Sequence, residues 1–453
     1  MSHFLGGIGM YLLACLGRQL PAFLYVAVVS FAQVSSVPGT PAVSSQSPVT
    51  GEQPIGEKDN PQLLAPLIDE LVENNPDIRA ARYRAEAAMA RPSQVSTLPD
   101  PRLSYTDFGV GHPFSTLGVS NFAYRGFGVA QEVPFPGKLA LAGEEARKEA
   151  QSEGQMYRTT LLDRTSRLKV AYYEWFSVAK SIEVTNRNRD LLERFEKIAR
   201  ARYAVGKGIQ ADVLRAQVEV SRLVQQLAVL EQRRKSAEAQ INALLNRSQT
   251  TPFGDPPNLK VSHLEYGLES LLSLVQQTSP QLRSKELLVE SRAVGVNRAK
   301  LEYRPDFNFS FQWQRTALQF PDYYMAVAEV KLPIYFSRKQ RYGVEEAAAR
   351  LQEARHNVRS TQQELLFTAK DQYLIATTSE KLLSLYEAGV IPQSSLALES
   401  TLSAYEVGNA DFLSLINSVS TLLGFEMQYY EELAKHEQAL ARLEPLIGRT
   451  LIQ

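Results

Sequence analysis

The chain has 453 residues, enough for up to three domains, so length sets no limit on the size of a hydrophobic core. Lysine plus arginine and aspartate plus glutamate each number 49, which leaves no net charge and argues against a nucleic-acid partner. The single cysteine, Cys15, excludes a disulfide framework and a cysteine-rich metal site.

The N-terminus begins with two apolar tracts, FLGGIGMYLLACLG and LPAFLYVAVVSFAQ. Each is shorter than the roughly 17 to 25 residues of a membrane-spanning helix. Arg18 precedes the second tract and SFA, ending at Ala32, closes it, as in a secretory signal peptide. We therefore expect residues 1–32 to be a signal peptide. The LLAC stretch also resembles a lipid-attachment site, so whether Cys15 is lipidated or lost with the signal peptide stays open.

The next segment, residues 33–60, is rich in Ser, Pro, Thr and Gly and poor in large apolar residues, which predicts a disordered leader. From Pro61 onward the pattern is helical. No proline occurs between Gly137 and Thr251, and Lys138 to Val205 predicts one helix of 68 residues, about 100 Å long. Apolar residues recur at coiled-coil spacing in two places: Val220, Leu223, Leu227 and Leu230, and Leu413, Ile416 and Leu423.

The chain is internally duplicated, because four landmarks recur in the same order 199 to 204 residues apart. The matched pairs are Pro76 with Pro280, Pro101 with Pro305, Pro134 with Pro333, and Gly206 with Gly408. We expect two repeats, at about 61–250 and 265–445, within one protomer spanning 61–445, and a C-terminal tail at 446–453.

Each repeat predicts two strands of about ten residues, the length that crosses a bilayer when tilted. They are expected at about 101–110, 124–133, 305–315 and 323–332. In the third, FNFSFQWQR alternates between an apolar and a polar face. Its apolar residues, Phe307, Phe309, Phe311 and Trp313, are expected to face lipid. Aromatic residues near the strand ends fit an interfacial girdle: Tyr105, Tyr124, Tyr303, Trp313, Tyr323, Tyr324 and Tyr335.

Four strands cannot close a barrel, and hydrocarbon does not tolerate an open sheet edge. Three copies would supply twelve strands, an even number that such barrels use. The predicted fold class is therefore mainly α with a membrane β-barrel: a homotrimer with a 12-stranded outer-membrane barrel, continued by a long periplasmic α-helical barrel.

Catalytic and metal-binding patterns are absent from the sequence. Its five histidines are scattered, without HExxH or a pair at ligand spacing. PFPGK lacks the upstream glycine and the following Ser or Thr of a phosphate loop. We expect no enzyme activity, no cofactor and no metal site.

Several of these segments together resemble the outer membrane efflux protein family, whose best-known member is TolC, over about residues 61–445. They are EVPFPGKLAL, the paired RYAVGKGIQADVLRAQ and AYEVGNADFLSLINS, and EAGVIPQSSLALES. PFPGK and GVIPQ are most similar to the heavy-metal branch of CusC and CzcC type. The resemblance implies the outer-membrane channel of a tripartite efflux system, with a periplasmic helical extension. It would be a passive exit duct, working with a periplasmic adaptor protein and a proton-driven inner-membrane pump, and its substrates would include heavy metals.

The resemblance also implies functional residues. The Val-Gly pairs Val205-Gly206 and Val407-Gly408, which the sequence alone explains as helix ends, would form the tip on which the adaptor docks. Acidic residues that ring the family's closed tip correspond here to Ser414 and Asn417, with Asp212 matching Ser414 in the first repeat. Asp411, about one turn earlier, and Tyr405 are the other gate candidates.

The alternative from another class is an exported or cytoplasmic coiled-coil scaffold that does not insert into a membrane. It explains the helices, but not the signal peptide or four strands of bilayer length at duplicated positions. Neither reading identifies the transported substrate or the cognate pump and adaptor.

Overall fold

The computed structural model describes residues 63–451, apart from 110, 115–121, 255, 258, 260 and 317–320. The expected signal peptide, Cys15 and the expected leader lie outside these residues, as do positions 452 and 453 of the expected tail.

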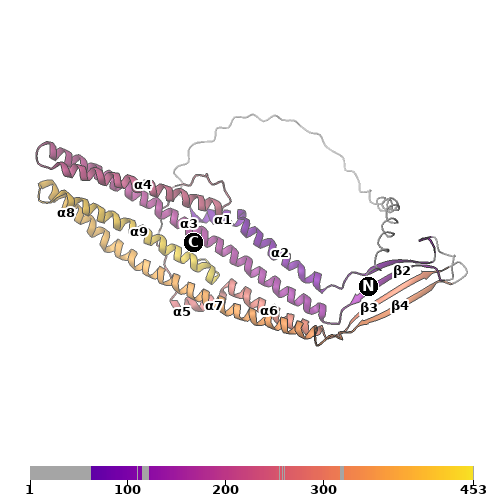
Figure 1. The fold of residues 1–453 in the computed structure, drawn as a ribbon. Coiled ribbons are helices and arrows are strands. Elements are labelled where there is room, and N and C mark those ends of the chain that lie inside the picture. Colours follow the sequence, from indigo (N-terminus) through magenta and orange to yellow (C-terminus); the bar gives the residue numbers. More distant parts are fainter. Residues whose placement is uncertain are drawn as a thin grey trace, which may run out of the picture. The chain divides into compact units, whose positions relative to one another are not determined.

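The two halves of the chain contain the same order of elements: two shorter helices, two strands and long antiparallel helices (Figure 1). In the second half a π-helical turn, η1, divides the first long helix. The elements are α1 (Leu64–Asn74), α2 (Pro76–Ser96), β1 (Arg102–Phe108), β2 (Tyr124–Val133), α3 (Lys138–Ala204), α4 (Gln210–Leu244), α5 (Leu268–Thr278), α6 (Pro280–Leu301), β3 (Asp306–Arg315), β4 (Tyr323–Lys331), α7 (Gln340–Leu385), η1 (Tyr386–Val390), α8 (Ile391–Val407) and α9 (Phe412–Ile447).

The helix boundaries follow local chemistry. Asn75 caps α2, since its side chain accepts hydrogen bonds from the backbone N–H groups of Asp77 and Ile78 at 2.9 and 3.1 Å. The 67-residue α3 contains no proline. In the second half Pro392, which lacks a backbone N–H, is the second residue of α8, just after η1, and the lost hydrogen bond accounts for the local widening to a π-turn. No helix among the described residues combines the length and the apolar character needed to cross a membrane.

The strands form one antiparallel sheet in the order β1-β2-β3-β4, so the second repeat continues the sheet of the first. The bounds expected from the sequence differ from the observed ones by at most two residues. In the register of the sheet Phe127 lies opposite Trp313, which lies opposite Tyr324. Residues that face each other in this way point to the same side of the sheet.

Two hydrophobic clusters hold the helices together. One lies where α3 and α9 meet the short helices α1 and α5, and it contains Trp175 and Leu440. The other joins α3, α4, α8 and α9 and contains Phe195, Leu223 and Phe412. The expectation that Leu413 lies in the apolar seam is wrong, because its side chain is 45% exposed while its neighbours Phe412 and Leu415 occupy the core.

Candidate functional site

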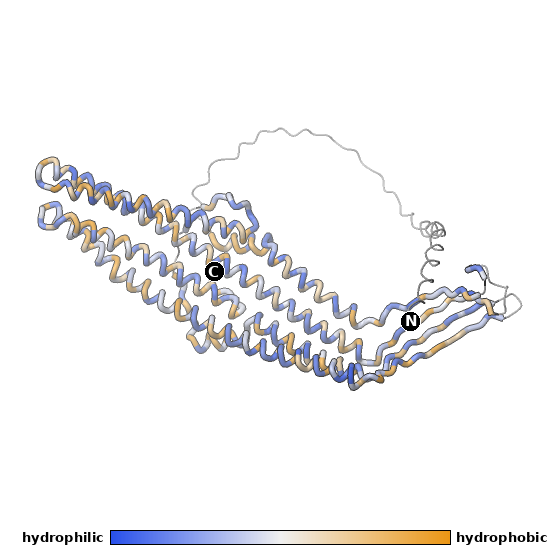
Figure 2. Tube along the Cα trace, viewed as in Figure 1, coloured by the Kyte–Doolittle hydropathy of each residue, from blue (hydrophilic) through white to orange (hydrophobic). Residues whose placement is uncertain are grey.

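One face of the sheet is apolar and exposed. Phe309, Phe311 and Trp313 are 50%, 48% and 38% exposed, and Phe307 is half-buried. Their partners on β1, β2 and β4 extend this apolar face, and hydrophobic residues recur along the strands in Figure 2. Exposed side chains on it include Leu103, Tyr105, Phe127, Val129, Phe309, Phe311, Trp313 and Tyr324. Apolar exposure on this scale calls for an apolar partner.

The opposite face is polar. The Gln312 Nε2 group donates to Thr106 Oγ1 at 2.9 Å, and Asn308 Nδ2 donates to Glu329 at 2.8 Å. Gly128 lies here because a Cβ at this position would come within 2.6 Å of Ser104 Oγ. Tyr124 and Tyr323 also point to this face. Tyr323 lies opposite Gln314, and Tyr124 lies opposite Phe108, whose side chain is on the same side as that of Thr106. The sequence grouped both tyrosines with the aromatic residues of a lipid interface.

Each outer strand of the sheet has one unpaired edge. β1 pairs only with β2, and β4 only with β3, among the described residues. The backbone N–H and C=O groups along these two edges have no strand partner within the described chain. A β-sheet left in this state is a template for pairing with another chain.

The PFPGK motif connects the two repeats at the base of the sheet. Gly137 has φ +96°, which places Lys138 at the start of α3. The Lys138 ammonium lies 2.8 Å from Asp306 and 3.3 Å from Glu302, and the Phe135 N–H donates to Asp306 at 2.9 Å. The sequence did not predict these contacts, because the partners lie more than 160 positions apart.

At the opposite end of the helices from the sheet, the two Val-Gly pairs occupy equivalent positions (Figure 1). Gly206 and Gly408 have φ +72° and +87°, and each ends its helix with the same pair of hydrogen bonds. The Gly408 N–H donates to the Tyr405 carbonyl at 3.1 Å, and the Asn409 N–H donates to the Ala404 carbonyl at 2.8 Å. Val205 and Val407 are 69% and 72% exposed, so both turns present an apolar residue to the surroundings.

Three of the five gate candidates lie close together beside these turns. Tyr405 is buried and its ring is tilted against that of Phe412, with ring centres 5.5 Å apart. Burial raises its pKa, the charge of Asp212 raises it further, and Arg202 lowers it. Burial also raises the pKa of Asp212, and the neighbouring Asp411 contributes in the same direction.

The other two candidates, Ser414 and Asn417, lie on α9, and Ser414 contacts the clustered residue Asp411. Asp411 is the N-cap of α9: it accepts the Ser414 N–H at 3.0 Å, and hydrogen bonds from Ser414 lower the pKa of Asp411. Asn417 is exposed one turn further along, and its carbonyl accepts the Thr421 hydroxyl. The structure therefore groups Tyr405, Asp212 and Asp411, with Ser414 attached through the cap, and leaves Asn417 outside.

Arg202 is the residue of this cluster that sequence reasoning missed. Its guanidinium lies over the Tyr405 ring and donates a hydrogen bond to the Tyr405 carbonyl. It comes from the end of α3, whereas Tyr405 lies on α8. The residue that matches it in the second repeat is Ala404, so the duplication gave no signal for it.

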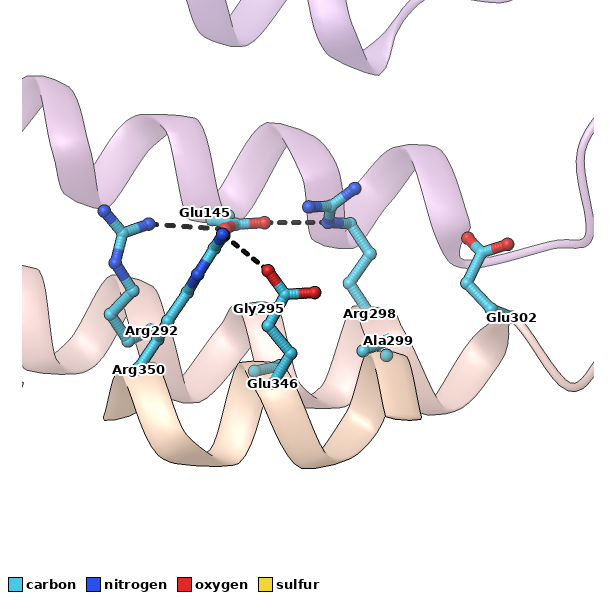
Figure 3. A pocket seen from close by; sticks show the side chains of 10 residues that line it. Glu145, Arg292, Gly295, Arg298, Ala299, Glu302, Glu346 and Arg350 are labelled. Carbon is cyan, nitrogen blue, oxygen red and sulfur yellow. Dashed lines mark hydrogen bonds and ion pairs between the residues drawn. The ribbon is translucent and has the colours of Figure 1, made fainter. Parts of the chain in front are cut away.

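A second charged cluster lies between α3, α6 and α7 (Figure 3). The side chains of Arg292 and Arg298 both point to Glu145, with nitrogen-oxygen distances of 3.8 and 2.7 Å, and Arg350 pairs with Glu346 at 2.6 Å. A Cβ on Gly295 would come within 2.9 Å of Glu145, so the glycine allows α6 to approach. Within the described ranges, no three His, Cys, Asp or Glu side chains are grouped as a metal site requires.

Solved structures with the same fold are outer-membrane channels. VceC from Vibrio cholerae has a TM-score of 0.73 and 17% identity, covering 86% of this chain and 97% of its own. The open-state MtrE channel of Neisseria gonorrhoeae has a TM-score of 0.72 and 17% identity. The match covers 86% of this chain and 89% of the MtrE chain. CusC has a TM-score of 0.74 and 15% identity, and the match covers 85% of this chain and 92% of the CusC chain.

The model of the outer membrane efflux protein family matches residues 67–247 and 271–449, more than half of the chain. The chain therefore belongs to the outer membrane efflux protein family, as the motifs of its sequence indicated. Its cellular location is accordingly the bacterial outer membrane, and the family consists of channel proteins rather than enzymes. Comparison of the sequence with curated proteins found no match. CusC is no more similar in sequence than VceC or MtrE, so the fold comparison does not favour the heavy-metal branch.

Proposed function

We propose that this protein is the outer-membrane channel of a tripartite efflux system, a passive exit duct without enzymatic activity or cofactor. The observation that carries the proposal is a four-stranded sheet with one exposed apolar face and two unpaired edges, continued by a helix of 67 residues. Such a sheet needs lipid on its face and further strands at its edges.

Three copies meet both needs. The β1 edge of one copy would pair with the β4 edge of the next, and closure after three copies gives the twelve-stranded barrel. Phe307, Phe309, Phe311 and Trp313 would then face lipid. The helices, attached at the other end of the strands, would extend into the periplasm as a second, α-helical barrel, with the Val-Gly turns at its far end.

The tip supplies the surface for a partner. Val205 and Val407 are exposed side chains on two equivalent, rigid turns, and we propose that the helical hairpin of a periplasmic adaptor docks beside them. An inner-membrane pump, driven by the proton gradient, would then deliver the substrate. The cluster of Arg202, Tyr405, Asp212 and Asp411 would hold the tip closed until the adaptor binds.

Heavy-metal ions are the substrate class that we propose to test first, on the basis of PFPGK and GVIPQ. PFPGK has a structural role here, since Lys138 joins the repeats through Asp306. Drug efflux is the alternative substrate class to compare, because this contact accounts for the motif without a metal.

The test is membrane fractionation of the full-length protein, gentle detergent extraction and native mass determination. A trimer from the outer-membrane fraction that forms ion-conducting pores in a planar bilayer is the expected result. A stable monomer or dimer from the soluble fraction would contradict the duct. Deleting the gene and measuring sensitivity to Cu²⁺, Zn²⁺ and Co²⁺ beside a panel of drugs then assigns the substrate class.

A further inference from the structure

The outer end of the apolar sheet face carries two arginines. Arg125 on β2 and Arg315 on β3 lie directly opposite each other in the register, on the same side as Phe127 and Trp313. Like charges in directly opposed positions of a sheet repel each other. Their placement on the face that otherwise carries apolar residues requires a reason.

Neighbouring acidic groups compensate only one of the two. The Arg125 Nε atom lies 3.6 Å from the carboxylate of Asp107, and Arg125 also donates to the Phe114 carbonyl. Arg315 is exposed, and no described residue forms an ion pair with it. Among the described residues, one of the two positive charges is therefore uncompensated, and Arg125 Nε has no hydrogen-bond partner there.

The position of the pair along the strands is equally specific. Proceeding away from the helices, this face passes from Phe309 and Phe311 to an aromatic row, and then to the arginines. That row consists of Tyr105, Phe127, Trp313 and Tyr324. Tyrosine and tryptophan occupy the boundary between hydrocarbon and headgroups, and cations beyond them reach headgroup phosphates. At the opposite end of the face, the corresponding row of Val133, Phe307 and Val330 carries no charge.

Neighbouring copies of the chain cannot cover this pair. β2 and β3 are the two central strands, so contacts between copies at the edges of β1 and β4 leave the pair accessible. In the proposed barrel this face is turned toward the membrane, so the lipid of the outer leaflet is the partner that the pair would meet. Arginine binds phosphate through two parallel N–H groups, which matches a headgroup with net negative phosphate charge better than a zwitterionic headgroup, whose phosphate charge is offset by its own ammonium group.

We propose that Arg125 and Arg315 form a binding site for a phosphate-bearing glycolipid of the outer leaflet. The site rests on the proposed insertion of the sheet into the membrane. The arginine pair binds the headgroup phosphate, and the aromatic row contacts the upper part of the acyl chains. Asp107 holds the Arg125 side chain in place.

The test measures lipid bound to the purified trimer by native mass spectrometry. The probes are lipid A, the same lipid after removal of its phosphates, and inorganic phosphate. The variants are the double substitution Arg125→Gln and Arg315→Gln, and the corresponding double substitution to Lys. A matched control, Arg102→Gln with Lys331→Gln, removes two cations from the polar face at the helical end of the same sheet.

The expected result is that retention of lipid A falls about fourfold or more in the Gln double variant and stays near wild type in the control. The Lys variant should retain an intermediate amount, because it keeps the charge and loses the bidentate geometry. Dephosphorylated lipid should bind weakly to every form, and inorganic phosphate should not displace lipid A. Equal retention by the wild type and the Gln variant, with both trimeric and conducting, would overturn this site alone. Failure of the wild type to form a trimer in the membrane would overturn the proposed function instead.

Discussion

The guanidinium carbon of Arg202 lies 4.7 Å from the centre of the Tyr405 ring, and the two residues come from different repeats. The contact ties the end of α3 to the end of α8 beside both Val-Gly turns. A cation over an aromatic face contributes about 0.5 to 1 kcal/mol at an exposed site and more when it is desolvated. Here the same arginine also donates to the backbone of Tyr405.

The substitution Arg202→Met should therefore loosen the tip by about 1 to 2 kcal/mol. In a planar bilayer we expect a longer open time of single channels than in the wild type. Arg194→Met is the matched control, since Arg194 is exposed on the same helix. Identical open times for the Arg202 variant and the control would exclude a gating role for this contact.

The substitution Asp411→Ala should lower the thermal stability of the tip at neutral pH, because it removes the N-cap of α9. Asp411→Asn should retain most of the stability. Hydrogen bonds lower the pKa of Asp411, so the stabilisation is present above the unfolded-state pKa, about 3.9, and is lost as the pH falls through the lower folded-state value. Hydrogen exchange of the Ser414 amide, followed from pH 7 down to pH 3, measures this loss. Equal protection in the wild type and the Ala variant at pH 7 would contradict the cap.

Asp212 should show the opposite pH dependence. Its pKa is raised by burial, so ionisation opposes folding, and stability increases as the pH falls through the raised value. Asp212→Asn should raise the melting temperature at pH 7 and leave it unchanged at pH 3, where the wild-type carboxyl is already neutral. Thermal unfolding of the detergent-solubilised protein at the two pH values tests this. A lower melting temperature of the variant at pH 7 would show that the carboxylate stabilises the tip.

A buried ion pair joins α3 to α9 in the other core cluster. Lys169 and Glu444 lie 2.7 Å apart, and their side chains are only 1% and 2% exposed. Lys169→Met should destabilise the protein by about 3 to 5 kcal/mol, because it removes the cation that neutralises the buried Glu444 carboxylate. Adding Glu444→Leu should recover most of that loss. Arg82→Ala, which breaks the surface pair of Arg82 with Glu86, should leave the unfolding temperature unchanged and serves as the control.

Lysine substitutions distinguish the two faces of the sheet. Phe309→Lys or Phe311→Lys should each cost about 2 to 4 kcal/mol near the bilayer midplane and reduce the yield of membrane-inserted trimer. Ser310→Lys, between them in sequence and on the polar face, should be tolerated. The amount of trimer that resists mild heating in detergent is the measurement. Equal yields from all three variants would mean that the apolar face does not contact lipid.

The sequence contained enough information for the elements, because their patterns are local. Strict alternation from Phe307 to Trp313 predicted β3, and the absence of proline predicted one long helix from Lys138, which the structure shows as the 67-residue α3. Glycines at duplicated positions identified both turns. The contacts between elements were not predictable in this way: Arg202 has no counterpart in the second repeat, and Lys138 meets Asp306 only after the repeats pair.

The sequence-based predictions that placed a side chain on the wrong face failed for the same reason, because they too depend on contacts between elements. Tyr124 and Tyr323 lie at strand ends, as expected of interfacial residues, but the register turns them to the polar face. Leu413 keeps the spacing of a seam residue, yet α9 begins at Phe412 and buries that residue instead. Asp411, a candidate for the gate, has a second role as the cap of α9 that depends on where the helix starts.

The unpaired edges of β1 and β4 also have a genetic consequence. A copy whose β1 edge is damaged can still offer an intact β4 edge, so in the proposed trimer it would be incorporated and would leave a gap in the ring. In a cell producing equal amounts of intact and damaged chains, about one assembly in eight would contain three intact copies. Edge variants should therefore be dominant, whereas variants that prevent the chain from folding at all should be recessive.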